Sequence, residues 1–228
     1  MSLLKFVKNE FSNLSKMETM FFPLVIVFIA VVSLLKNDSI IALIASVCGI
    51  TYTIFAGKGK ISCYIFGLIA TVCYSYLTFI QGYWGNFTLH VGYYLPMGIV
   101  GIFLWKKNLK IEKQEIKKTQ LPLKQRLLYF TFAGVLSVVV FFLLGEKEIL
   151  LIRVLDSITT VFALLGMFLT VKRCVEQWWV WFIVNICSAL MWVYAYVGGA
   201  NCISIILKWL VYAVLAVYFL RKWEKDLG

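Results

Sequence analysis

The sequence predicts an all-α, polytopic membrane protein with eight transmembrane helices, arranged as a parallel repeat of two three-helix bundles. The first observation is composition: of 228 residues, 62% are hydrophobic and only 14% are charged, and the mean hydropathy is +0.88. Soluble domains are closer to half apolar and a quarter charged. The second observation is a series of apolar runs of membrane-spanning length, and the third is the distribution of Lys and Arg.

The apolar runs have the length that a helix needs to cross a bilayer, which is about twenty residues. The spans that we predict are residues 19–35, 39–56, 61–81, 87–105, 127–145, 149–171, 176–197 and 201–220. Long continuous runs such as "FFPLVIVFIAVVSLL" lack the alternation of a β-barrel strand. The start of the chain lacks an apolar run followed by a cleavage site, so we expect no signal peptide.

The basic residues predict the orientation. With both termini in the cytoplasm, eighteen Lys and Arg residues fall in inner segments, and only Lys36 and Lys147 fall in outer loops. Cytoplasmic loops of membrane proteins collect basic residues in this way. The net charge of +11 is therefore interpreted as a signal of membrane orientation and not of nucleic-acid binding. The basic linker 106–126 is interpreted as a segment that meets anionic lipid headgroups, with a regulator-binding segment as the alternative.

An internal repeat predicts the domain organisation. The segments "KGKISCYIFGLIATVCYSYLTFIQG" and "VKRCVEQWWVWFIVNICSALMWVYAYVGG" both begin at a basic turn and end at a glycine turn. Aligned through those glycines, Tyr64 falls on Trp181, Thr71 on Ser188 and Ser75 on Trp192. Spans two to four then match spans six to eight in the same orientation, and in such repeats the solute lies near the midplane between the bundles. The predicted parts are an extra first span (1–35), a first bundle (36–107), a linker with a connector helix (108–146) and a second bundle (147–228).

The seventh span carries a polar and aromatic stripe. Trp178, Trp181, Asn185, Ser188 and Trp192 are three or four residues apart, so they share one helical face. Asn185 lies about 14 Å into the span at 1.5 Å per residue, close to the middle of a ~30 Å hydrocarbon core. An interfacial belt can explain Trp178 and Trp179, but not an amide at that depth. We predict that Trp181 and Asn185 line a cavity, with helix–helix packing as the alternative.

Other polar residues within the spans are further candidates. Asp156 can pair with Arg153 one turn away or contact a solute, and both roles stay open. Lys208 lies within the last span and can reach backbone, Asp156 or the outer surface. His90 has Tyr94 one turn below it, and Pro96 is expected to kink their helix. Tyr64 is a candidate through its place in the repeat.

Catalytic and metal sites are not predicted. The sequence has no nucleotide-binding, metalloprotease or nucleophile-elbow motif. The six cysteines have no metal-ligand spacing and are interpreted as small buried thiols. We therefore expect no enzyme, no cofactor and no bound metal.

The motif WxxWxxxN at Trp178, Trp181 and Asn185 resembles the bacterial PnuC family of vitamin transporters, which shares a superfamily with the SWEET sugar carriers. "LDSITT" at 155–160 and "YIFG" at 64–67 resemble the same family, and the span pattern of essentially the whole chain fits it. The resemblance implies uniport of nicotinamide riboside across the bacterial inner membrane, trapping by cytoplasmic phosphorylation, and a homotrimer. It also implies substrate contacts for the WxxWxxxN residues.

The chain departs from the family pattern at two places, His90 where Gln is common and "GIVGI" at 98–102 where an Asn-x-x-Gly-Trp run is common. Relatives in the family carry thiamine or riboflavin. The alternatives are therefore another vitamin or a sugar, or a membrane sensor that transports nothing. The full set of predicted substrate-binding residues is Trp181, Asn185, Trp178, Asp156, His90, Tyr94, Tyr64, Ser188 and Lys208.

Overall fold

The computed structural model describes residues 15–35, 39–80, 84–110, 115–143, 149–199 and 203–227. The chain divides into two compact units, Met1–Lys117 and Lys118–Gly228. The boundary between them lies inside the segment predicted as a linker. Some residues used in the predictions lie outside the described ranges, namely Lys36, Gly82, Lys147 and Cys202.

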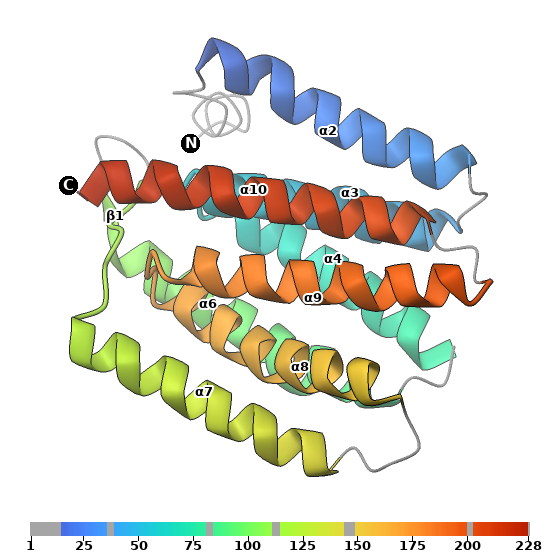
Figure 1. Cartoon of the computed structure of the whole chain (residues 1–228). Helices are drawn as coiled ribbons and strands as arrows, with labels where there is room; N and C mark the ends of the chain where they lie inside the picture. The colour runs from blue at the N-terminus through green and yellow to red at the C-terminus, as the bar shows by residue number, and fades with distance from the viewer. Residues whose placement is uncertain are drawn as a thin grey trace. The chain divides into compact units, whose positions relative to one another are not determined.

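The described residues of the first unit form helices and one short hairpin (Figure 1). Its helices are α2 (Lys16–Leu35), α3 (Ile40–Gly57), α4 (Cys63–Ile80), α5 (Trp84–Leu89), the π-helical turn η1 (His90–Tyr94) and α6 (Leu95–Lys107). α2 packs on α3, α3 on α4, and α4 on α5, η1 and α6. Strands β1 (Leu109–Lys110) and β2 (Glu115–Ile116) pair antiparallel after the last helix.

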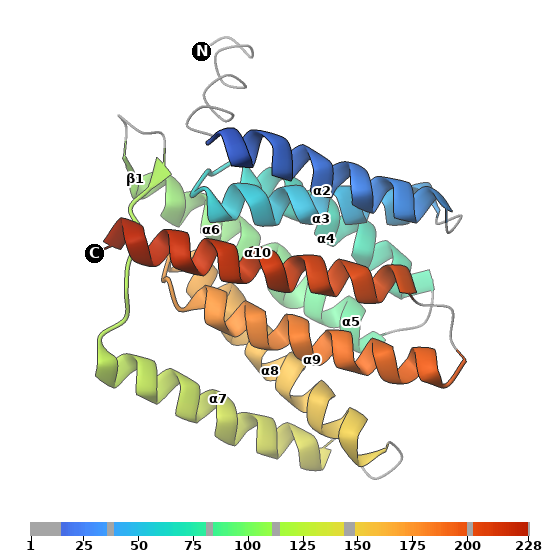
Figure 2. The same ribbon diagram turned by 45° about the horizontal axis from the view of Figure 1, so that its top comes forward.

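The second unit consists of four helices that run roughly along one another, drawn from yellow-green to red in Figures 1 and 2. They are α7 (Leu123–Leu143), α8 (Leu150–Val171), α9 (Gln177–Val197) and α10 (Ile203–Leu227). Each helix packs against the next one along the chain.

The helices follow the predicted spans, and their composition supports a membrane location. Within the described residues, six segments are long and apolar enough to cross a bilayer: α2 from Glu18, α3, Phe87–Lys107, α7, α8 and α9. α4 contributes the shorter apolar stretch Cys63–Leu77. The protein is therefore a multi-pass membrane protein, while crossing by α4 and α10 stays a prediction.

The first helix is attached to its unit by a buried ion pair. Glu18 Oε2 lies 3.1 Å from Lys58 Nζ, and both side chains are buried. Ser15 and Glu18 form a capping box at the start of α2: the Ser15 N–H donates to Glu18 Oε2 (2.9 Å) and the Glu18 N–H donates to Ser15 Oγ (3.1 Å). One carboxylate thus begins α2 and also holds it at the C-terminal end of α3.

The two turns that follow α3 and α8 have the same backbone geometry. Gly59 (φ 69°) and Arg173 (φ 63°) both adopt the left-handed conformation. The next N–H donates back into the helix in each case, from Lys60 to Phe55 O (2.9 Å) and from Cys174 to Leu169 O (3.0 Å). This is the Schellman arrangement that ends many helices.

Superposing the two turns in the sequence gives an offset of 114 residues, which pairs Tyr64 with Trp178 and not with Trp181. The ring contacts agree with this register: Tyr64 lies 5.0 Å from Trp105, and Trp178 lies 5.2 Å from Phe219. The register predicted from the sequence differs from this one by three residues, because it was anchored on the glycines at the other end. α9 has 21 residues and α4 has 18, so alignment from that end is displaced by the difference.

Pro96 changes the local hydrogen bonding. Before it, the helix widens into η1, in which the Leu95 N–H donates to His90 O, five residues back. Proline has no N–H to donate and its ring crowds the carbonyl four residues earlier. A wider turn accommodates both effects, and π-turns of this kind occur often at functional sites.

Gly101 is required by close contact with Tyr64. A Cβ at position 101 would overlap the Tyr64 ring, and that ring is held by Trp105 and Tyr52. We expect Gly101→Ala to lower the free energy of unfolding by about 1–3 kcal/mol, the cost of overpacking. Gly134→Ala is the matched control, since nothing lies within 4 Å of its added Cβ. Melting of the purified variants in detergent measures both, and equal melting temperatures would contradict the prediction.

The five described cysteines are free thiols: Cys48, Cys63, Cys73, Cys174 and Cys187. Cys174 lies in the turn after α8, where burial raises the pKa of its thiol. Among the described residues, no group of three or more His, Cys, Asp or Glu side chains is arranged to hold a metal ion.

Candidate functional site

Trp181 is held in place by two residues of the neighbouring helix α8. Its indole Nε1–H donates to Thr170 Oγ1 at 3.0 Å. The Thr170 hydroxyl in turn donates to Gly166 O at 2.8 Å. A hydroxyl can donate and accept at once, so Thr170 satisfies the indole without leaving its own proton unpaired.

Gly166 makes room for the indole ring. A Cβ at this position would lie 3.0 Å from Cε2 of Trp181, so the ring is packed directly on the backbone of α8. Small residues one turn apart, here Gly166 and Thr170, let membrane helices approach closely. Trp181 is therefore fixed in both position and tilt.

Asn185 lies one turn further along α9 from Trp181. It is 5% exposed, and no hydrogen bond of its side-chain amide is found among the described residues. Ser188, on the same face, is also buried. Burying an amide without a partner is costly, most of all within a membrane. The face with Trp181 and Asn185 therefore offers a fixed aromatic ring beside an amide with donors and an acceptor available.

The tryptophans at the start of α9 have different surroundings. Trp178 is 3% exposed and packs against Phe219 (5.2 Å) and Trp223 (5.7 Å) of α10. Its indole N–H is buried and lacks a hydrogen-bond partner within the described part of the chain. Trp179 is 49% exposed. An interfacial belt therefore fits Trp179 but not Trp178, which is enclosed by aromatic rings.

The first unit has an aromatic group around the π-helical turn. The His90 ring lies 4.7 Å from the Tyr74 ring and 4.9 Å from the Tyr94 ring. The η1 turn thus brings two of the predicted site residues together and adds Tyr74 from α4. Tyr64, in contrast, is buried against Trp105 and Tyr52.

The charged candidates in the second unit lie on two helices. The Arg153 guanidinium of α8 lies over the Phe141 ring at 4.0 Å. Asp156 is partly buried, and its backbone carbonyl accepts from the Thr159 hydroxyl (3.0 Å). Lys208 of α10 lies 5.4 Å from the Trp209 ring.

Sequence reasoning missed Thr170, Gly166 and Tyr74 as parts of these groups. The Gly-x-x-x-Thr spacing in α8 is the small-residue pattern of close helix packing. It could therefore have indicated that Trp181 of α9 packs against α8. No pattern in the sequence indicated Tyr74.

Comparison with known proteins assigns this arrangement to a family. Residues 39–225 match the family model described as "Nicotinamide mononucleotide transporter". The nicotinamide riboside transporter PnuC of Neisseria mucosa is 31% identical, and the alignment covers 99% of this chain and 87% of that protein. PnuC of Haemophilus influenzae is 29% identical, over 82% of this chain and 80% of that one.

The fold agrees with the same group. A crystal structure of the vitamin B3 transporter PnuC superposes with a TM-score of 0.84 at 29% sequence identity, covering 99% of this chain and 97% of the other. These are transporters and not enzymes. The chain therefore belongs to the PnuC family, which the matching family model describes as nicotinamide mononucleotide transporters.

Proposed function

We propose that this protein is a uniporter that moves nicotinamide riboside across a bacterial inner membrane by alternating access. The observation that carries the proposal is the indole of Trp181, held by Thr170 one turn from Asn185, a buried amide with no hydrogen bond among the described residues. The relatives of this chain are named nicotinamide riboside transporters. Substrate contact by the remaining predicted residues stays a prediction for each of them separately: Trp178, Asp156, Ser188 and Lys208 in the second unit, and His90, Tyr94 and Tyr64 in the first.

The chemistry of the solute fits this pair. Nicotinamide riboside carries a positively charged pyridinium ring, and a tryptophan face attracts a desolvated cation by about 2 kcal/mol. The Asn185 amide has two donors and one acceptor oxygen, which match a carboxamide or ribose hydroxyls. The membrane potential favours inward movement of a cation by about 2.3 kcal/mol per 100 mV without a coupling ion. Trapping by cytoplasmic phosphorylation would then keep the gradient directed inward.

The topology belongs to the proposal too. Both termini are placed in the cytoplasm, eight helices cross the membrane in the 3+1+3 order after the extra first helix, and three chains form a homotrimer. The matched turns at Gly59 and Arg173 and the equivalent ring pairs support the repeat. The excess of Lys and Arg in the inner segments supports the orientation.

Calorimetry and flux test the function. Purified protein should bind nicotinamide riboside, and liposomes containing it should accumulate the solute faster when the interior is negative. Tight binding of thiamine or riboflavin, with none of nicotinamide riboside, would overturn the substrate assignment. Binding without flux would identify a sensor instead of a transporter.

Thr170→Val should weaken nicotinamide riboside binding while leaving the protein folded. Valine preserves the shape of the side chain but removes the acceptor for the Trp181 indole N–H, so the ring loses its fixed tilt. We expect about a fivefold rise in Kd, equivalent to one net hydrogen bond of about 1 kcal/mol. Thr51→Val is the matched control, because the Thr51 hydroxyl donates to Val47 O (2.8 Å) within its own helix. Calorimetric titration of both variants decides, and an unchanged Kd in Thr170→Val would contradict the positioning role.

A further inference from the structure

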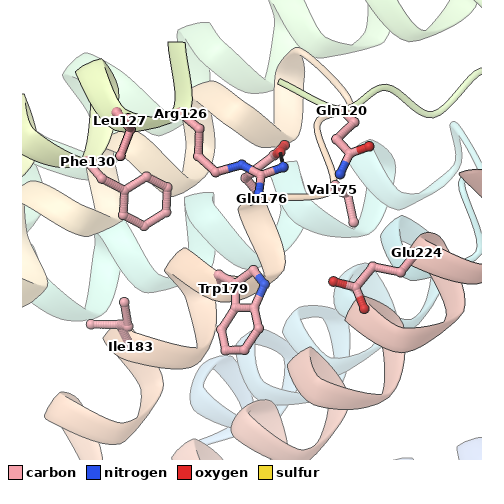
Figure 3. Close-up of a pocket in the computed structure, with 9 residues that line it drawn as sticks. All are labelled: Gln120, Arg126, Leu127, Phe130, Val175, Glu176, Trp179, Ile183 and Glu224. Carbon is pink, nitrogen blue, oxygen red and sulfur yellow. Dashed lines mark hydrogen bonds and ion pairs between the residues drawn. The ribbon is translucent and has the colours of Figure 1, made fainter. Parts of the chain in front are cut away.

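A pocket of about 330 Å³ lies in the second unit, where α7 and α9 begin and α10 ends (Figure 3). Its lining joins charged and apolar side chains: Gln120, Arg126, Leu127, Phe130, Val175, Glu176, Trp179, Ile183 and Glu224. It is separate from the Trp181–Asn185 face, since neither residue lines it. Nothing in the proposed transport function uses it.

One wall of the pocket presents a fixed guanidinium group. Arg126 Nη2 donates to Glu176 Oε1 at 2.8 Å. Glu176 is 2% exposed, and its two oxygens also accept from the Leu121 N–H at 3.1 and 3.3 Å. Arg126 Nε is buried and has no hydrogen-bond partner within the described residues. The guanidinium is thus held in place by one carboxylate while it still has donors to offer.

The other wall presents a carboxylate and an aromatic face. Glu224 is exposed on the last turns of α10, and in Figure 3 its carboxylate is directed toward Trp179. Figure 3 shows Trp179 below the Arg126–Glu176 pair, with the Glu224 carboxylate to its right, and about half of the surface of Trp179 is exposed. A carboxylate next to an exposed indole face is suited to an ammonium group.

The apolar part of the pocket lies one turn deeper along the same helices. Phe130 follows Arg126 by four residues on α7, and Ile183 follows Trp179 by four on α9, a rise of about 6 Å along each axis. Leu127 is 60% exposed beside them. The polar groups are therefore at the helix ends and the apolar groups are toward the middle of the spans, the polarity gradient of a membrane boundary.

We propose that this pocket binds a phospholipid whose headgroup carries both a phosphate and a primary ammonium, the chemistry of phosphatidylethanolamine. Arg126 binds the phosphate, Glu224 and the Trp179 face bind the ammonium, and Leu127, Phe130 and Ile183 contact an acyl chain. Charge selects this class of lipid: two carboxylates and one guanidinium line the pocket, so a purely anionic headgroup meets net repulsion. A zwitterionic headgroup places each of its charges against an opposite one.

Native mass spectrometry of the full-length protein in detergent tests the proposal. The protein is given equal amounts of phosphatidylethanolamine and phosphatidylglycerol with identical acyl chains, and the bound ratio is measured. The wild type should retain the ethanolamine lipid in preference by about fivefold, and Glu224→Gln should bring the ratio close to one, the change expected for one exposed ion pair. Trp179→Ala should lower retention of the ethanolamine lipid as well.

Glu115→Gln is the matched control, since it makes the same chemical change outside the pocket and should leave the ratio as in the wild type. Equal retention of both lipids by the wild type, or an unchanged preference in Glu224→Gln, would show that this pocket does not recognise the lipid headgroup. If Trp179→Ala changes the number of subunits in the same spectra and not the bound lipid, the pocket is a contact between copies of the chain, and the lipid proposal is wrong.

Discussion

Trp181→Ala is expected to weaken nicotinamide riboside binding by about 30-fold or more, because it removes the aromatic face for the pyridinium ring. The loss corresponds to a cation–π contact of about 2 kcal/mol. Alanine leaves a void beside Gly166 and removes the indole donor to the Thr170 hydroxyl, so no other aromatic face replaces the lost one. Calorimetric titration measures the change, and flux into proteoliposomes should fall with it.

Two further variants of α9 show whether the loss of binding is specific to the aromatic face of Trp181. Trp179→Ala is the control, because this side chain is on a different face and lines the pocket of Figure 3, which contains neither Trp181 nor Asn185. Its Kd for nicotinamide riboside should equal that of the wild type. Trp181→Phe keeps a smaller aromatic face, so its Kd for nicotinamide riboside should lie between those of the wild type and Trp181→Ala. Wild-type affinity in a normally folded Trp181→Ala protein would remove Trp181 from the site.

Glu18→Ala is expected to destabilise the protein by about 3–5 kcal/mol, since it leaves the Lys58 ammonium buried without this carboxylate. The substitution also removes the capping box at the start of α2, as the Ser15 N–H loses its acceptor. Denaturant unfolding in mixed micelles gives the free energy of unfolding. The expected cost is large because both members of the pair are enclosed.

The double variant Glu18→Leu with Lys58→Met separates the ion pair from packing. Replacing a buried ion pair by apolar side chains is often close to neutral, so the double variant should recover most of the stability that Glu18→Ala loses. If the double variant is less stable than either single variant, the two residues act independently and the pair is not what holds α2.

The sequence predicted the helical fold and the order of its apolar segments because apolar runs of fixed length have one stable form in lipid. The described helices follow those runs from α2 to α10. The register between the two halves could not be predicted, since it depends on backbone geometry: the left-handed residue is a glycine at 59 and an arginine at 173. Nothing in the type of residue 173 indicated a left-handed turn.

The candidate site was predicted in part. Spacing alone put Trp181, Asn185 and Ser188 on one face, and the amide and hydroxyl are buried there. Spacing placed Trp178 on this face but could not show that its ring is enclosed, because the enclosing rings are Phe219 and Trp223, some forty residues later in the chain. The partners of Trp181 on α8 depended in the same way on how two helices cross, which no single-helix pattern contains.

The contact between aromatic ring and glycine is reversed between the two halves. In the first, Tyr52 of α3 fills the space over Gly67 of α4; in the second, Trp181 of α9 fills the space over Gly166 of α8. At 114-residue spacing, Tyr52 corresponds to Gly166 and Gly67 to Trp181.

The reversal links the residue at each of these positions to its contact partner. Giving position 67 a large side chain alone would drive it into Tyr52, while shortening Tyr52 alone would leave a cavity that costs about 3–5 kcal/mol. Each single substitution therefore lowers stability unless the contact partner changes with it. A side chain copied from one unit to the matched position of the other would meet the wrong member of the contact.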